Sequence, residues 1–230
     1  MKPIDVQWLG RIEYGAALDL QTRLVEQYLS GTGSEKLLLL EHEPVYTIGR
    51  TRDRSSLRSA GALPHPVFEI NRGGQATWHG PGQLVAYPIL DLERHGRDLH
   101  RYMRFLEETI ILTCRELGVE GHRREGLTGV WVGHRKIASI GVGVRRWVTM
   151  HGLALNVGRS SLEPFLHITP CGIVDVEMTC LEMESRRSPN VQDASAILAA
   201  IFLRKLADLP ASGPEEADQP ASPAGRTDQP

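Results

Sequence analysis

The chain has 230 residues, an apolar content of 41% and a formal net charge of −2. This length favours a single domain with an ample core, and the weak charge argues against strong nucleic-acid binding. The sequence contains no apolar run of about 18 residues, so we expect no membrane span. Three cysteines without a disulfide framework, and no apolar leader at the N-terminus, favour the cytoplasm.

The first quarter of the chain predicts a strand, a helix and two more strands. Residues 6–9 predict a short strand, and apolar residues recur at helical spacing between 17 and 28. The apolar run 37–40 predicts a buried strand, and 44–49 a further strand. A charged loop follows, for which two interpretations stay open: a solvated surface, or docking of a small acidic protein partner. Its basic residues are Arg50, Arg52, Arg54 and Arg58.

Two further helices and several strands are predicted in the remainder. An apolar stripe predicts a helix over 99–117. The last helix is expected to begin with Ser188 as N-cap and Pro189 at its first position. Strands are predicted at 84–90, 129–132, 136–144 and 148–157.

This order of elements indicates an α/β or α+β domain, a mixed sheet flanked by helices, over residues 1–209. Residues 210–230 are rich in Pro, Ala and acidic residues, and we expect them to form a disordered tail.

The tetrapeptide 170–173, Pro-Cys-Gly-Ile, is the clearest candidate for chemistry. Proline fixes the backbone before Cys171, and glycine leaves space after it for a substrate carbonyl. A reactive thiol and a structural cysteine remain alternatives at this turn. Cys114 and Cys180 lie in ordinary apolar contexts, so we expect both to be small buried hydrophobes.

Lys136 begins an otherwise apolar strand. In a regular strand it shares a face with Ala138 and Ile140, whereas Ser139 and Gly141 share the other. Its side chain either extends to solvent, or is desolvated and becomes a usable base. A charged ammonium would instead favour a thiolate, so either form would assist a nearby cysteine.

Residues 72–83 place two glycine-rich groups around His79. No Gly-Lys-Ser/Thr follows, so this is not a P-loop, although its amides could bind a phosphate, carboxylate or thioester oxygen. His42 and His151 also lie near predicted turns, where a lone histidine is usually a structural hydrogen-bond partner. The cysteine and histidine spacings match no zinc template, so we expect no metal.

Small residues recur in two neighbouring predicted strands, at Gly141, Gly143, Gly152 and Ala154. They indicate either close packing against a helix or a smooth channel for an unbranched acyl chain.

Six segments, in this order, resemble the lipoyl(octanoyl) transferase family over residues 4–209. Departures are mild: Glu43 stands where proline is usual, and Trp78 where tyrosine is common. The matching segments are 41–49, 72–83, 129–131, 136–141, 151–156 and 170–173.

The resemblance implies the biotin/lipoate ligase catalytic fold. It also implies transfer of an octanoyl or lipoyl group from acyl carrier protein to a lysine of lipoyl domains. Those acceptors are the E2 subunits of 2-oxoacid dehydrogenases and the glycine cleavage H protein. No cofactor and no ATP are implied, and a monomer is the default expectation.

The family pattern also assigns roles. Cys171 would carry the acyl-thioester, and Lys136 would lower the cysteine pKa and act as acid and base. Beside these roles, His42, His151 and Asn156 are candidates for a supporting role. The substrate-binding positions are Arg72, Gly73, Gly74, Gln75, Ala76, Thr77, Trp78, His79, Ser139, Ile140, Gly141, Gly152, Leu153 and Ala154.

Four other functions are alternatives: an ATP-dependent lipoate or biotin ligase, a lipoyl amidotransferase, a thioesterase, and a non-catalytic module that binds acidic carrier domains. Gln75 stands where the ligases usually have a third consecutive glycine, which counts against the first. The amidotransferase has its cysteine in a different motif. The presence of both Lys136 and Cys171 counts against the last.

Overall fold

The computed structural model describes residues 3–49, 56–57, 63–70, 72–173 and 176–209. The expected tail at 210–230 and the basic cluster at Arg50, Arg52, Arg54 and Arg58 lie outside the described residues. None of the helices in the described part is both long and apolar enough to cross a membrane.

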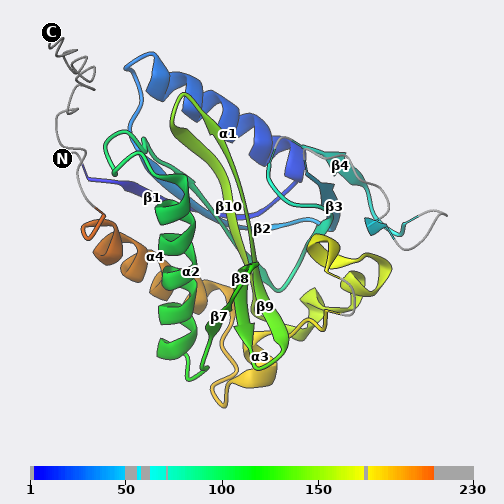
Figure 1. Cartoon of the computed structure of the whole chain (residues 1–230). Coiled ribbons are helices and arrows are strands. Elements are labelled where there is room, and N and C mark those ends of the chain that lie inside the picture. Colours follow the sequence, from blue (N-terminus) through cyan, green and yellow to red (C-terminus); the bar gives the residue numbers. More distant parts are fainter. Residues whose placement is uncertain (1–2, 50–55, 58–62, 71, 174–175, 210–230) are drawn as a thin grey trace, which may run out of the picture.

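The described residues form a seven-stranded sheet of order β1-β2-β6-β10-β9-β8-β7 and a three-stranded sheet of order β4-β3-β5 (Figure 1). Strands β1 and β2 pair in parallel and the other pairs of the large sheet are antiparallel, so the sheet is mixed. The strands are β1 (Asp5–Ile12), β2 (Lys36–His42), β3 (Val45–Ile48), β4 (Val67–Glu69), β5 (Thr77–His79), β6 (Gln83–Ile89), β7 (His122–Arg124), β8 (Leu127–Val132), β9 (Arg135–Arg145) and β10 (Val148–Asn156). The helices are α1 (Tyr14–Leu29), α2 (Leu99–Glu116), α3 (Leu181–Glu184) and α4 (Val191–Leu206), with 3-10 turns η2 (Arg159–Ser161), η3 (Glu163–His167) and η4 (Pro170–Gly172).

Helices cover both faces of the large sheet (Figure 1). Apolar residues of α2 and α4 pack on one face, where the larger core includes Phe105 and Phe202. Helix α1 packs on the other face through Ala17, Leu24 and Val25. Burial of these two apolar surfaces is what holds the three layers together. The predicted mixed sheet flanked by helices is therefore confirmed.

A bulge in β9 changes the face on which Lys136 lies. Strand β8 pairs Val130 with Ala138 but pairs the next residue, Trp131, with Lys136, so Ile137 is an extra residue. Directly paired residues share a face and neighbours alternate, which places Lys136 and Trp131 opposite the core face of Val130 and Ala138. The regular alternation expected from the sequence is wrong here, because the bulge reverses it.

The start of the last helix also differs from the prediction. Ser188 has a φ of 43°, and it precedes rather than caps the helix. Asn190 is the N-cap, and its side chain accepts a hydrogen bond from the amide of Asp193. The prediction that Cys114 and Cys180 are buried is confirmed.

The small sheet and the 3-10 turns form a second, smaller core beside the large sheet. Tyr46, Trp78 and Phe165 bring together β3, β5 and η3. The amide of Thr169 donates to the carbonyl of Ser56 at 2.6 Å. These contacts fix the start of η4, the turn that contains the backbone of Cys171.

Candidate active site

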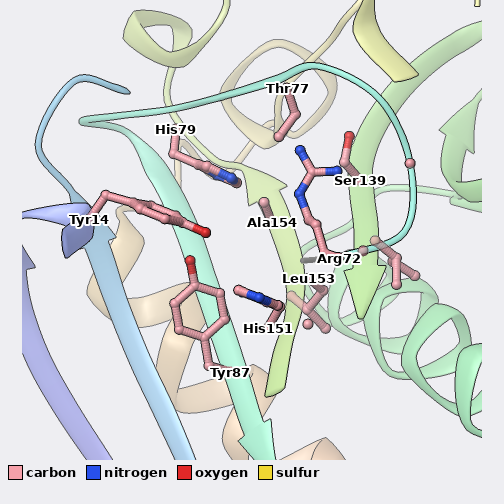
Figure 2. A pocket seen from close by; sticks show the side chains of 13 residues that line it. Tyr14, Arg72, Thr77, His79, Tyr87, Ser139, His151, Leu153 and Ala154 are labelled. Atoms are coloured by element: carbon pink, nitrogen blue, oxygen red, sulfur yellow. The ribbon is translucent and has the colours of Figure 1, made fainter. Parts of the chain in front are cut away.

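A pocket lies between the loop before β5 and the central strands β9 and β10 (Figure 2). The empty space of about 430 Å³ at this pocket includes open solvent. One wall consists of small or apolar residues of β9 and β10, and the other carries polar and aromatic groups. The lining residues are Tyr14, Arg72, Gly74, Thr77, His79, Tyr87, Ser139, Ile140, Gly141, His151, Gly152, Leu153 and Ala154.

Arg72 is the buried arginine of this pocket, and its guanidinium organises the loop. It donates to the backbone oxygens of Thr47, Gly73 and Gln75 at 2.8–3.1 Å. It also donates to the hydroxyl of Thr47 at 2.8 Å. Because an arginine has several donors in a fixed plane, one side chain holds the loop against β3.

Two glycines allow the loop to approach the sheets. A Cβ on Gly49 would overlap the carbonyl oxygen of Gly74, so the loop backbone contacts the end of β3 directly. A Cβ on Gly141 would lie 2.9 Å from Cδ of Arg72 and 3.1 Å from the carbonyl oxygen of Gly73. The predicted glycine surface is thus occupied in part by the loop, which roofs the pocket.

Hydrogen bonds fix the tautomers of His79, which lines the pocket, and of His42, which lies behind Tyr87. Nδ1 of His42 donates to the carbonyl of Ile12 at 3.1 Å, so its Nε2 accepts from the hydroxyl of Tyr87 at 2.7 Å. Nδ1 of His79 donates to Oε1 of Gln83 at 2.8 Å, which leaves its Nε2 as an acceptor. Gln83 in turn donates to Asn156 at 2.9 Å. Asn156 therefore supports His79 through one intermediate residue.

Burial keeps these imidazoles neutral. It lowers the pKa of His42 and of His151 to about 4, in the second case with help from the positive charge of Arg72. Burial, and next the neighbouring His42, hold the pKa of His79 well below its ordinary value. Burial likewise raises the pKa of the Tyr87 hydroxyl. The inner wall is polar but carries no ionised histidine at neutral pH.

His151 has an unusual backbone. Its φ is 58°, and its amide donates to Oε1 of Gln21 at 2.7 Å. Its side chain is 2% exposed, and among the described residues Nδ1 has no hydrogen-bond partner. A non-glycine residue in the left-handed region is strained, so tertiary contacts must hold this ring at the pocket.

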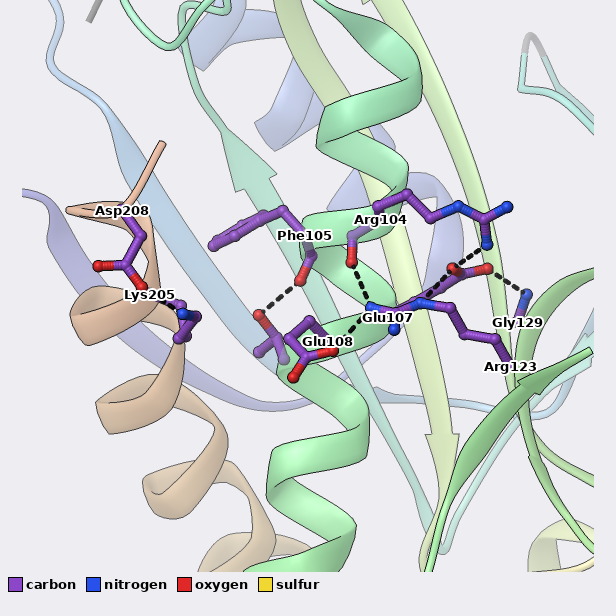
Figure 3. A network of polar contacts seen from close by, with 9 residues as sticks. Arg104, Phe105, Glu107, Glu108, Arg123, Gly129, Lys205 and Asp208 are labelled. Atoms are coloured by element: carbon purple, nitrogen blue, oxygen red, sulfur yellow. Dashed lines mark hydrogen bonds and ion pairs between the residues drawn. The ribbon is translucent and has the colours of Figure 1, made fainter. Parts of the chain in front are cut away.

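Lys136 lies in a buried niche on the pocket side of the sheet. Its side chain is 1% exposed and Nζ lies 5.5 Å from the centre of the Trp131 ring. Gly129 opposite has no side chain, and a Cβ there would lie 2.8 Å from Cε of Lys136. Buried Glu107 accepts from the amide of Gly129 at 3.2 Å, and it also binds Arg123 (Figure 3). Helix α2 thereby fixes the wall of the lysine niche.

The Pro170–Gly172 turn contacts the same loop that roofs the pocket. A Cβ on Gly172 would overlap the side chain of Gln75, and Gly172 has a φ of 69°. The side chain of Cys171 lies outside the described residues. The backbone of this turn lies against the pocket loop, and Lys136 lies on the pocket face of β9.

The structure gathers most of the predicted substrate positions around one pocket, although their role in binding stays a prediction. Ten of them line it. Gly73 and Gln75 belong to the loop behind the lining, and Ala76 and Trp78 are buried in the small core. Tyr14 and Tyr87 line the pocket but were missed, since single tyrosines in a helix and a strand resemble core residues. In the described part, no cluster of three His, Cys, Asp or Glu residues could hold a metal.

Residues 13–203 match the model of the lipoyl protein ligase A/B catalytic domain. The chain belongs to this family. An octanoyltransferase of Geobacter sulfurreducens is 51% identical over 222 residues, covering 96% of this chain and 92% of the relative. An octanoyltransferase of Nocardia farcinica is 42% identical over 231 residues, which cover 96% of this chain and 90% of that relative. The prediction of an acyltransferase from the lipoyl(octanoyl) transferase family is confirmed.

Solved structures show the same fold. The putative lipoate protein ligase Ta0514 of T. acidophilum with bound lipoic acid aligns with a TM-score of 0.70 at 12% identity, covering 90% of this chain and 86% of that one. The biotin protein ligase of Aquifex aeolicus with biotin and ATP aligns with a TM-score of 0.56 at 12% identity. This alignment covers 89% of this chain and 71% of the ligase. At such identities the likeness concerns the fold, which is the predicted biotin/lipoate ligase catalytic fold.

Proposed function

We propose that this protein transfers an octanoyl group from acyl carrier protein to a lysine of lipoyl domains through a thioester on Cys171. The observation that carries the proposal is the bulge in β9, which turns buried Lys136 towards the face where the Pro170–Gly172 turn lies. The names of relatives that match over most of the chain support the choice of acyl group.

The reaction divides into two steps. The Cys171 thiolate attacks the carbonyl of the donor thioester, and the carrier thiol departs with a proton from Lys136. The neutral amine of an acceptor lysine then attacks the acyl-enzyme carbonyl and gives one proton to Lys136, and the Cys171 thiolate leaves as the amide forms. Thioester exchange is nearly balanced and aminolysis is downhill, so the sequence of steps needs no ATP.

The pocket supplies a place for the acyl chain. Small and apolar residues of β9 and β10 form much of one wall, and Gly152 adds no side chain to it. On the opposite wall, Tyr14, His79 and Tyr87 are neutral at neutral pH and the charge of Arg72 is paired with backbone oxygens, so an apolar chain displaces no ionised histidine or tyrosine.

Intact mass spectrometry tests this proposal. The protein is incubated with octanoyl-acyl carrier protein without ATP, and then with an apo-lipoyl domain. We expect a hydroxylamine-labile octanoyl adduct that is absent from Cys171→Ser and that the lipoyl domain removes. Cys180→Ser serves as the matched control and keeps the adduct.

Two results would contradict the proposal. Acylation that occurs only with ATP would indicate the ligase reaction. An adduct that water removes as quickly as the lipoyl domain does would indicate a thioesterase.

A further inference from the structure

A second hollow lies beside the Pro170–Gly172 turn, and we call it the acceptor groove. It is formed by η3, the start of η4 and the segment before α3. Its floor and rim include Phe165, Leu166, Pro170 and Met178, together with the carboxylates of Glu163 and Glu177. Among the described residues, the groove shares no lining residue with the pocket described above.

Backbone contacts connect the acceptor groove to both groups of the proposed reaction. Pro170 directly precedes Cys171 in the chain. Met178 forms an isolated bridge with Lys136, and the amide of Lys136 donates to the carbonyl of Glu177 at 2.8 Å. A group seated in the groove is therefore next to the cysteine backbone and next to the strand that holds the lysine.

The turn has a hollow on each of its two sides. Gly172 lies against Gln75, whose loop supplies Gly74 and Thr77 to the first pocket. Pro170 lines the acceptor groove. A thioester formed on this turn would extend its acyl chain into the first pocket, so the groove leaves room for a second reactant.

The chemistry of the acceptor groove matches a lysine side chain. Leu166 is 70% exposed and lies beside other apolar residues, which suits the methylene stem of a lysine. Glu163 and Glu177 would attract the ammonium group. Nε2 of His134 lies 3.0 Å from Oε2 of Glu177, and among the described lining residues there is no Lys or Arg.

We propose that the acceptor groove docks the segment of the acceptor domain that presents the target lysine. This inference rests on the proposed function, and it places the acceptor of the second step in a groove separate from the first pocket. An acidic carrier domain would be repelled by the two carboxylates, so the donor must approach by another face.

Single-turnover kinetics separate the two steps. The variants Leu166→Asp and Glu163→Lys change exposed side chains, and the cysteine and Lys136 are unaltered. We expect the second-order rate of discharge of the octanoyl-enzyme to an apo-lipoyl domain to fall by about tenfold in each. Acylation by octanoyl-acyl carrier protein should stay within about twofold of the original rate.

Discharge to hydroxylamine supplies an internal control. This small nucleophile needs no docking surface, so its rate should be unchanged in both variants. Matched control variants are Leu203→Asp on α4, where the leucine is 40% exposed, and Glu120→Lys at another exposed position. Both should discharge to the lipoyl domain at the original rate.

If the proposed function were wrong, the unmodified protein would form no octanoyl adduct. That result differs from every outcome expected for the groove variants. An acylation rate that falls while discharge is unchanged would show that the groove binds the carrier instead. Equal discharge rates in the groove variants and in the control variants would overturn the inference.

Discussion

Lys136 depends on one extra residue for its position. Without Ile137 as a bulge, β9 would present Lys136 to the core of α2 and α4, where a charged group has no polar surroundings. With the bulge, its stem occupies the space opposite Gly129. The position on which its proposed role depends thus follows from a local irregularity of the sheet, since a bulge re-aims a side chain.

Removal of this amine should change the pH dependence of acylation. In Lys136→Ala we expect the rate of adduct formation at pH 7 to fall by about a hundredfold or more, because the Cys171 thiol would ionise as an ordinary cysteine. The rate should recover partly near pH 9, where more thiolate is present. Stopped reactions followed by intact mass across this range measure the effect.

Arg135→Ala is the neighbouring control, because it removes a positive charge that pairs with Glu184 rather than the buried amine. Its pH profile should match that of the unmodified protein. If Lys136→Ala kept the original profile, the assigned role of Lys136 would be wrong.

At the scale of elements, the pocket is formed by a loop that fits tightly over two sheets. Arg72 fixes this loop through carbonyl groups, and Gly49 and Gly141 provide the space beneath it. The loop backbone therefore has little freedom to adjust to added volume.

Gly49→Ala should destabilise the protein. The new methyl group would overlap the carbonyl of Gly74, so the loop must move, which costs about 3 kcal/mol in the free energy of unfolding. Urea denaturation measures this loss. Gly15→Ala on α1 is the control, because the nearest atom, in Phe68, is 3.8 Å away, and it should gain up to about 1 kcal/mol. Equal stabilities of the two variants would contradict this account of the loop.

The sequence predicted the regular elements well, because hydrophobic periodicity determines them. Helix α2 and strands β6 and β10 lie within a residue or so of their predicted bounds. Hydrophobic periodicity does not predict irregular backbone. The bulge at Ile137 depends on pairing with β8, and the cap at Asn190 depends on the path of the preceding turn. The small residues of β9 and β10 left a channel and close packing as alternatives, and the substrate-binding positions came from the family resemblance. No pattern in the sequence predicted the acceptor groove.

At the scale of the whole molecule, buried neutral histidines couple folding to pH. The unfolded chain takes up protons on His42 and His151 as the pH falls below about 6.5, whereas the folded chain does so only near a pKa of about 4. Their contribution to stability is thus fully present above pH 6.5 and is lost as the pH falls towards 4.

His151→Gln should reduce this dependence. Between pH 6 and pH 5 we expect the free energy of unfolding of the unmodified protein to fall, relative to the variant, by about 1 kcal/mol. Urea denaturation at both pH values measures the difference. The exposed His122→Gln should show no such relative change, and a constant difference for His151→Gln would contradict burial as the cause.

The Pro170–Gly172 turn, with a hollow on each side, has a consequence for exchange of the two protein partners. If the acyl chain stays in the first pocket, the carrier can dissociate before the acceptor binds. Between these events the enzyme alone holds the acyl group. The lifetime of the octanoyl-enzyme would then depend on how readily water reaches its thioester bond. A cell could keep a reserve of octanoylated enzyme until an unmodified acceptor is made.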